Sequence, residues 1–351
     1  MMVAKSLYVA GPPGSGKTGV CAALAMKLRE EGLRVAYFKP VGYAPGPERR
    51  DEDALLMKEL LGMEEPLEEI VPFNYTPLYL SRYAKDGHLE TVAAAYRKLA
   101  RKVDALLVGG GPSPHAMAGL GLDVATIAGE LEIPVLLVLR VSNDQSLDLA
   151  IFYHHHLRGE GLEVAGVIFN HVPRPLLDKA RGVYRPFLET RGGRLLGIMP
   201  ERLEITAPTV EEFYDVVGGE ILAAEDHLGA VVEDVVVGAM TLESALRYFR
   251  RAPNKVVITG GDRSDLALAA LETSTSALIL TGGLYPDVQV LARAEEKEVP
   301  VILVGHDTFT TIELLHDITR KIKPTNLQAL QLARESLEAH CEVEAILAYL
   351  R

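Results

Sequence analysis

The segment "SLYVAGPPGSGKT", residues 6–18, decides the fold of the first part of this chain. Apolar residues run into a loop of glycine and proline, and the loop ends in Lys17 and Thr18. Its last eight letters, residues 11–18, fit the pattern GxxxxGK[ST], and helix-forming residues follow from 17 to 31. A strand, this loop and a helix in that order are the context in which the pattern cradles phosphates. We therefore predict a phosphate-binding loop, or P-loop, over residues 11–18.

The residues of this loop have distinct expected roles. Glycines let the backbone wrap around phosphate groups with its N–H groups pointing inward, and the start of the following helix adds its positive dipole end. Lys17 would pair with the β- and γ-phosphate oxygens, and the Thr18 hydroxyl would bind Mg²⁺. The predicted nucleotide-binding residues of the loop are Gly11, Pro12, Pro13, Gly14, Ser15, Gly16, Lys17, Thr18 and Gly19. The alternative is a glycine-rich turn between strand and helix that holds no ligand.

Apolar runs of strand length alternate with amphipathic helical stretches from the first residues to about residue 200. Examples of the strands are "RVAYFKP" (34–40), "PVLLVLR" (134–140) and "VAGVIFN" (164–170), and examples of the helices are 52–61 and 144–158. Continuous apolar strands are buried on both faces, and helices between them provide the crossover that parallel pairing needs. The pattern predicts an α/β fold with a doubly wound parallel sheet, as in a P-loop NTPase domain.

A second cycle of strands and helices begins near residue 209. The connector at 200–213 contains two prolines and mixed polarity, which favours a domain boundary there. We expect a P-loop domain over 1–208, a smaller α/β domain over 209–323, and a C-terminal helical segment over 324–351. That last segment has the amphipathic pattern of one long helix or two short ones.

The overall composition excludes several classes of partner. Hydrophobic residues make up 48% of the chain, but no run approaches the roughly twenty apolar residues that a membrane helix needs. The first residues lead straight into a strand without a secretory signal, so we expect a cytoplasmic protein. The net charge of −12 argues against nucleic acid, because such binding depends on clustered lysine and arginine. We expect neither a membrane nor a nucleic-acid partner.

Three further segments resemble dethiobiotin synthetase and its relatives: "GLRVAYFKPVGY" (32–43), "DEDALLMKELLG" (51–62) and "GVIFNHVP" (166–173). The resemblance implies that Lys39 lies beside the transferred phosphoryl group. It also implies that Asp53 binds Mg²⁺ and that Asn170 reads adenine. Taken singly, each residue has an ordinary alternative role. Lys39 could be a solvated charge, Asp53 an acid at a helix N-terminus, and Asn170 a turn residue.

The second domain has its own resemblance. The segments "GGDRSD" (260–265) and "LTGGL" (280–284) resemble the DRTGG domain, named for such residues. A synthetase-like half joined to a DRTGG domain is similar to the amino-terminal part of long phosphotransacetylases, over essentially the whole chain. No residues after 351 remain for the acetyl-transferring domain, so acetyl transfer is not expected. The paired glycines at 260–261 and 282–283 suit a ligand crevice at a sheet edge and tight turns equally well.

One acidic residue of the synthetases is missing from this sequence. The strand equivalent to "DALLVGG" (104–110) ends in Glu-Gly in those enzymes, and the glutamate position falls on Gly109. Losing a fixed charge beside the transferred group implies a cost of a few kcal/mol in the transition state, or two to three orders of magnitude in rate. Magnesium binding would weaken without disappearing, because water can replace one carboxylate. His115 and Asp123 are the candidates that would fill the gap.

Three functional hypotheses follow from these segments. The first is an ATP- and Mg²⁺-binding protein with a regulatory or sensory role through its DRTGG domain, which would take an unknown small-molecule ligand. The second is an ATP-dependent carboxylase or amide ligase, in which Lys17 and Lys39 would be catalytic and Thr18 and Asp53 would hold the metal. The third is a partner of a separate acetyl-transferring chain. We expect a homodimer or a dimer of dimers.

Overall fold

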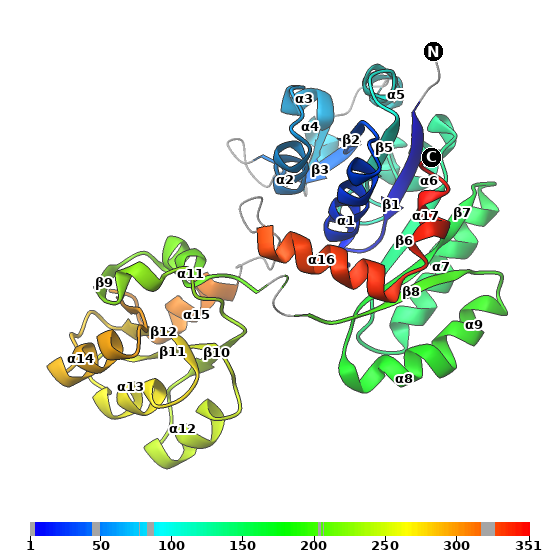
Figure 1. The fold of residues 1–351 in the computed structure, drawn as a ribbon. Coiled ribbons are helices and arrows are strands. Elements are labelled where there is room, and N and C mark those ends of the chain that lie inside the picture. Colours follow the sequence, from blue (N-terminus) through cyan, green and yellow to red (C-terminus); the bar gives the residue numbers. More distant parts are fainter. Residues whose placement is uncertain are drawn as a thin grey trace. The chain divides into compact units, whose positions relative to one another are not determined.

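The computed structural model describes residues 4–43, 50–76, 78–82, 88–202, 205, 207–316 and 327–351. The chain divides into two compact units, which Figure 1 shows in the colours of the sequence. The first unit contains Met1–Ile205 and Ile322–Arg351, and the second contains Thr206–Lys321. Both units have the α/β architecture that the sequence predicts, with a parallel sheet in the first.

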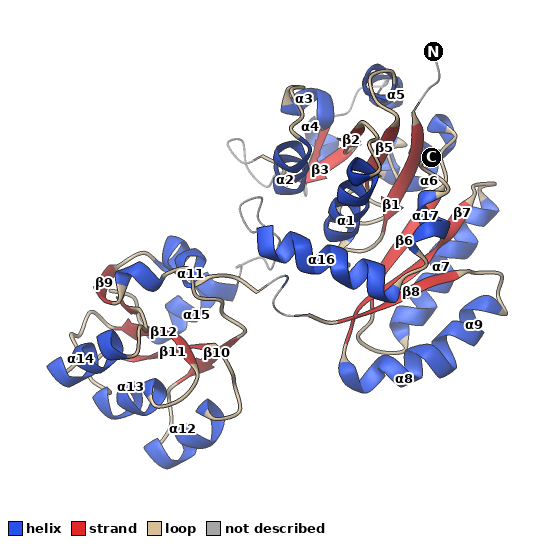
Figure 2. Cartoon of the chain, in the orientation of Figure 1, coloured by secondary structure: helices blue, strands red, loops and turns tan. Residues whose placement is uncertain are grey.

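The first unit is built on a six-stranded parallel sheet in the order β2-β5-β1-β6-β7-β8 (Figure 2). Its strands are β1 (Lys5–Ala10), β2 (Val35–Phe38), β5 (Ala105–Gly109), β6 (Val135–Arg140), β7 (Val164–Val172) and β8 (Leu195–Pro200). A separate pair, β3 (Val41–Tyr43) and β4 (Phe73–Tyr75), is also parallel. Consecutive residues Leu7 and Tyr8 of β1 belong to different hydrophobic layers, which explains the continuous apolar run of this strand.

Helices cover both faces of this sheet, as a doubly wound fold requires. One hydrophobic layer is formed with α1 (Lys17–Glu30), α2 (Glu52–Leu61), α3 (Leu67–Ile70), α16 (Leu327–His340) and α17 (Val343–Leu347). The other is formed with α5 (His88–Ala100), α6 (Val124–Leu131), α7 (Gln145–Gly159) and α9 (Arg185–Glu189). The short helices α4 (Tyr79–Arg82) and α8 (Leu177–Lys179) complete the unit. None of the described helices is long and apolar enough to cross a membrane.

The C-terminal segment returns to the first unit as two helices, α16 and α17. Leu337 and Ile346 are buried in the same hydrophobic layer as α1. Where Cys341 bridges to β8, a Cβ on Gly197 would lie 2.2 Å from the Cys341 sulfur, so only glycine fits there. Arg334 of α16 forms an ion pair with Glu30 at the end of α1. The boundary expected between residues 323 and 324 lies outside the described residues.

The second unit has a five-stranded sheet in the order β10-β11-β12-β13-β9. Its strands are β9 (Glu220–Ala223), β10 (Asp234–Val237), β11 (Lys255–Gly260), β12 (Thr275–Thr281) and β13 (Val301–Leu303). All neighbours pair in parallel except β9, which is antiparallel to β13. The helices α12 (Leu242–Phe249), α13 (Ser264–Leu271) and α14 (Val288–Glu296) bury one face, and α11 (Val210–Val217) and α15 (Thr308–His316) bury the other.

Candidate phosphate-binding site

The predicted P-loop lies between the central strand β1 and helix α1. Strand β1 pairs with β5 on one side and β6 on the other, so the loop leaves the carboxyl edge in the middle of the sheet. Gly14 and Gly16 have φ values of 67° and 83°, which favour glycine, and helix α1 begins at Lys17. The first N–H groups of a helix have no partners within it, so they remain available to an anion.

The ends of β6 and β7 hold the loop in place. A Cβ on Gly11 would lie 1.9 Å from the Val138 carbonyl oxygen, and one on Gly16 would lie 2.2 Å from Nδ2 of Asn170. Asn170 is buried, and its Nδ2 donates to the Ser15 carbonyl oxygen at 3.0 Å. In this structure the Asn170 amide therefore supports the loop.

His171, which the sequence analysis did not single out, also lies against the loop. Its Nε2 would be 2.8 Å from a Cβ on Gly16, and its φ of 49° lies in the left-handed region. Burial, followed by the charge of Arg140, lowers the pKa of His171 to about 4. The imidazole is therefore neutral at pH 7. The only sequence signal for it was its position next to Asn170.

Lys17 is turned back onto its own loop. Its Nζ donates to the carbonyl oxygens of Gly11 at 2.9 Å and Pro12 at 2.8 Å. Burial lowers the pKa of Lys17 to about 8, although the nearby carboxylate of Asp53 opposes that shift. Neutral carbonyls compensate a partly buried ammonium less well than an anion does. A phosphate group in the loop would supply that anion.

Lys39 and two aspartates form a buried cluster beside the loop. Lys39 follows β2, and its Nζ lies 2.9 Å from Oδ2 of Asp51 and 2.6 Å from Oδ2 of Asp53. Lys39 and Asp51 are each 3% exposed, whereas the Asp53 side chain is 26% exposed. Burial acts to lower the pKa of Lys39, but Asp53 and Asp51 more than offset it, so the pKa lies above its usual value. Lys39 is therefore held as a cation.

Asp51 is a site residue that the sequence analysis missed. It caps helix α2, accepting a hydrogen bond from the backbone N–H of Ala54 at 2.9 Å. It also accepts from the backbone N–H of Tyr43 at 2.6 Å. The available signal was an aspartate directly before a helical stretch, where capping residues concentrate. Asp51 thus fixes both Lys39 and the start of the helix that carries Asp53.

The residues near the loop fit the donor set expected for Mg²⁺. Thr18 lies in the first turn of α1 and Asp53 in the first turn of α2. Asp53 lies close enough to Lys17 to influence its pKa. Magnesium is commonly held by one or two protein oxygens together with phosphate oxygens and water. In the described part of the chain, no group of three or more His, Cys, Asp or Glu side chains has the arrangement of a metal site by itself.

The space at Gly109 is already filled. Gly109 pairs with Val9 of β1, next to the P-loop, and its φ lies outside the left-handed region. A Cβ on Gly109 would lie 1.8 Å from the hydroxyl oxygen of Tyr37 and 2.4 Å from its Cζ. A glutamate at position 109 is therefore excluded by the Tyr37 side chain, which occupies the space that any side chain at this position would need.

The two residues proposed to fill the gap have other partners. Both carboxylate oxygens of Asp123 are used at the start of α6, by the N–H of Ala125 at 3.0 Å and by the Thr126 hydroxyl at 2.7 Å. The His115 Nε2 lies 3.3 Å from the Ser113 hydroxyl. Neither side chain takes the place of the missing acid.

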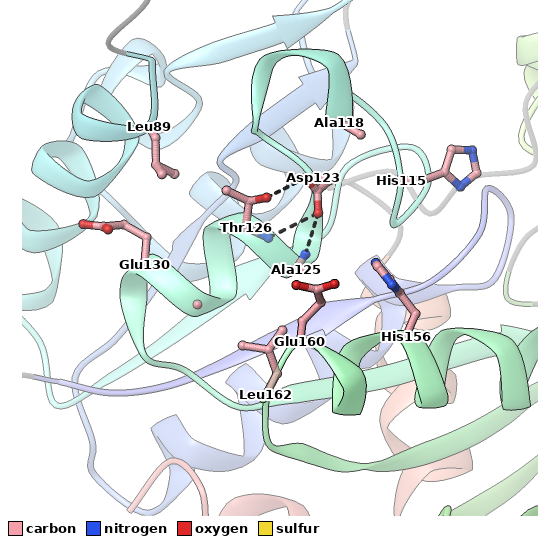
Figure 3. A pocket seen from close by; sticks show the side chains of 11 residues that line it. Leu89, His115, Ala118, Asp123, Ala125, Thr126, Glu130, His156, Glu160 and Leu162 are labelled. Atoms are coloured by element: carbon pink, nitrogen blue, oxygen red, sulfur yellow. Dashed lines mark hydrogen bonds between the residues drawn. The ribbon is translucent and has the colours of Figure 1, made fainter.

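Asp123 and His115 instead line a groove of about 550 Å³ between α6 and α7 (Figure 3). Its other lining residues are Leu89, Ala118, Ala125, Thr126, Gly129, Glu130, His156, Glu160 and Leu162. Helices α6 and α7 belong to the hydrophobic layer opposite the one that contains α1. The groove is therefore a feature separate from the P-loop.

In the second unit, the predicted DRTGG residues lie around strand ends. A Cβ on Gly261 would lie 1.7 Å from the Leu284 carbonyl oxygen, so glycine permits a close approach of two backbone segments. Gly282 and Gly283 have φ values of 85° and 65°, as tight turns require. Arg263 forms two hydrogen bonds of 2.9 Å with the Asp265 carboxylate. These contacts explain the glycines by backbone geometry.

Comparison with known proteins gives matches across both units. Residues 5–209 match the AAA domain family, and residues 212–318 match the DRTGG domain family. The phosphate acetyltransferase of Nitratidesulfovibrio vulgaris is 24% identical over 97% of this chain and 51% of its own length. That of Synechocystis is 25% identical over 99% of this chain and 52% of its own length. The chain thus spans about half the length of the curated relatives that it matches.

Among solved structures, the septum site-determining protein MinD from Pyrococcus horikoshii, complexed with Mg-ADP, is 18% identical. The match covers 57% of this chain and 83% of that one, with a TM-score of 0.38. The predicted combination of a P-loop part and a DRTGG domain, as in phosphotransacetylases, is confirmed by the two family matches and by the two phosphate acetyltransferases. The AAA match spans more than half of the residues, and the chain therefore belongs to the AAA domain family, with a DRTGG domain after it.

Proposed function

We propose that this protein binds ATP with Mg²⁺ and that the DRTGG domain makes it a regulatory or sensory protein. The observation that carries the proposal is Lys17, a partly buried ammonium whose partners in the described structure are the carbonyls of Gly11 and Pro12. Two glycines with positive φ shape the loop in front of it. This arrangement suits a phosphate group that would exchange with the two carbonyls.

The neighbouring residues support the same ligand. Lys39 would add a second fixed cation near the terminal phosphate, and Thr18 and Asp53 would hold the magnesium ion. Bound Mg²⁺ would neutralise negative charge on the phosphates. Asp53 would then have to exchange its 2.6 Å contact with Lys39, whereas Asp51 would keep Lys39 in position. Asn170 is proposed to contribute at the base, in addition to its contact with Ser15.

Titration calorimetry with ATP and MgCl₂ tests the proposal. We expect saturable binding by the wild type and no measurable binding by Lys17→Ala, because that change removes the main cation of the loop. Lys27→Ala is the matched control, since Lys27 also lies on α1 but pairs with Glu338 at 3.4 Å. Equal affinity of wild type and Lys17→Ala would refute the phosphate-binding role of the loop.

The second candidate is an ATP-dependent carboxylase or amide ligase. The buried Lys39 beside Asp53 favours it, because phosphoryl transfer needs fixed cations around the transferred group. The absence of an acid at Gly109 disfavours it. Steady ATP hydrolysis by the wild type, dependent on Lys39, would support this enzyme over the regulatory protein. A third candidate, a partner for a separate acetyl-transferring chain, draws on the phosphate acetyltransferase relatives and is tested by co-purification with such a chain.

We also propose that the protein forms a homodimer or a dimer of dimers through its DRTGG domain. Large apolar side chains are exposed on this unit, among them Tyr248, Leu284, Tyr285 and Val288. Exposed apolar side chains of this size are common where chains associate. Small-angle scattering at micromolar concentration would contradict the proposal by returning the mass of a single chain.

A further inference from the structure

Tyr37 occupies the position at which the acid is missing. In the parallel pairing of β2 with β5, Tyr37 lies opposite Leu107, and Gly109 is two residues further along the same face. Side chains on a strand lean along it, so the Tyr37 ring extends over Gly109. Tyr37 is 1% exposed and belongs to the hydrophobic layer that contains α1. The Tyr37 side chain on β2 thus fills the space that a side chain at Gly109 on β5 would need.

The Tyr37 hydroxyl lies close enough to Asp51 and Asp53 for their charges to influence it. Burial raises its pKa well above the usual value, and Cys21, Asp53 and Asp51 raise it further. The hydroxyl is therefore protonated and able to donate at every physiological pH.

We propose that Tyr37 takes over the role of the missing acid as a neutral hydrogen-bond donor to the phosphate end of the nucleotide, directly or through one bridging water. This inference rests on the proposed ATP binding. A carboxylate in this position would attract the cation and repel the phosphates. A hydroxyl donates to phosphate oxygens, so it makes nucleotide binding less dependent on the divalent cation.

The charge of the cluster supports this role. Lys17 and Lys39 supply two positive charges, and Asp51 and Asp53 supply two negative charges, so the four side chains are neutral together. A glutamate at position 109 would make the cluster negative and would need the metal to offset it before phosphates could enter. With Tyr37 in that space the cluster stays neutral.

The first test replaces Tyr37 by phenylalanine. We expect Tyr37→Phe to melt at about the same temperature as the wild type without ligand, because the phenylalanine ring fills the same space in the hydrophobic layer. We expect its ATP affinity to fall about tenfold, because a hydrogen bond to a charged phosphate is lost. Tyr8→Phe is the matched control, since Tyr8 is equally buried but faces the opposite hydrophobic layer. Its ATP affinity should not change.

The second test exchanges the two side chains. Gly109→Glu alone should lower the melting temperature, because the new side chain collides with the Tyr37 ring. Tyr37→Leu together with Gly109→Glu removes the collision. For this double variant we expect the ratio of ATP affinities with MgCl₂ and with EDTA to rise at least about tenfold above that of Tyr37→Leu alone.

The outcomes separate this inference from the proposed function. If the wild type binds no ATP with or without MgCl₂, ATP binding itself is wrong, and the inference is wrong with it. If the wild type binds ATP and loses it with Lys17→Ala, but Tyr37→Phe binds with unchanged affinity, the role of Tyr37 is refuted while the proposed function stands. An unchanged magnesium ratio in the double variant also refutes it.

Discussion

At the residue scale, the contact between Lys39 and Asp51 is the most deeply buried ionic interaction of the site, since both residues are 3% exposed. We predict that Asp51→Asn lowers the free energy of unfolding by about 2 to 4 kcal/mol, because it leaves a buried cation with one charged partner fewer. Asparagine still caps a helix, so the loss reports on the charge. Urea denaturation of the first unit measures it.

Asp53→Asn is the control for this prediction. The Asp53 side chain is 26% exposed, and solvent screens its contact with Lys39. Its loss should be clearly smaller than that of Asp51→Asn. Equal losses would mean that burial does not distinguish the two aspartates.

Lys255 is a buried cation of the second unit. It is 0% exposed, and its Nζ donates to the Thr273 hydroxyl at 2.8 Å and the Ser274 carbonyl at 2.7 Å, over the ring of Phe249. Burial lowers the pKa of Lys255 from 10.5 to about 8, although Asp234 opposes this. The folded state therefore releases this proton more readily than the unfolded chain does. The charged Lys255 therefore lowers the free energy of unfolding of the second unit below pH 8, and this destabilisation disappears as the pH rises from 8 to 10.5.

We predict that Lys255→Met raises the free energy of unfolding at pH 7 by about 1 to 3 kcal/mol, and that the gain shrinks at pH 10. Hydrogen exchange of the amides of β11 and β12 assigns the change to the second unit. Lys297→Met, at an exposed position of the same unit, should have no such effect. A gain of equal size at both pH values would show that the ammonium charge is not its cause.

At the scale of elements, the turn from β1 into α1 depends on two glycines that have different surroundings. A Cβ on Gly16 would meet Asn170, whereas a Cβ on Gly14 would meet nothing within 4 Å. Both have positive φ, which costs a non-glycine residue roughly 1 to 2 kcal/mol. Gly14→Ala introduces this backbone strain only. Gly16→Ala introduces the same strain and also a collision with the Asn170 side chain, which supports the loop.

We therefore predict that Gly16→Ala lowers the melting temperature more than Gly14→Ala and also removes ATP binding. Each additional kcal/mol should appear as a shift of about 2 to 4 °C for a unit of this size. Thermal denaturation and calorimetry with ATP measure the two effects. Equal melting temperatures for the variants would contradict the contact between Gly16 and Asn170.

At the scale of the whole molecule, the first unit is discontinuous in sequence. Helices α16 and α17 and the residues after them close its hydrophobic layer with side chains that are at most 1% exposed, namely Leu330, Leu337, Ile346, Leu347 and Leu350. Each large apolar side chain contributes roughly 1.5 to 3 kcal/mol when buried, so their sum reaches the typical stability of a domain.

We predict that residues 1–208 alone do not fold cooperatively. A protein in which a Gly-Ser linker of about ten residues replaces 206–321 should retain the cooperative melting of the first unit, because it keeps both helices. Circular dichroism during heating compares the two. Cooperative melting of 1–208 at the temperature of the linked protein would contradict the structural role of α16 and α17.

The sequence by itself determined the features that depend on neighbours along the chain. The P-loop pattern, the strand before it and the helix after it are local, and the predicted helix 17–31 is observed as Lys17–Glu30. Apolar runs without alternation were sufficient to predict a parallel sheet with helices on both faces.

Only the tertiary structure decided which distant residues meet. Tyr37 and Gly109 are 72 positions apart, and neither has a local signal that couples it to the other. The antiparallel strand β9 and the return of α16 to α1 are likewise set by packing between remote segments. Local propensity describes one segment at a time, whereas the burial of apolar surface stabilises contacts between segments that are far apart in the sequence. The order of strands and the side chain that fills the gap at Gly109 are therefore properties of the packed core, which a single sequence does not display.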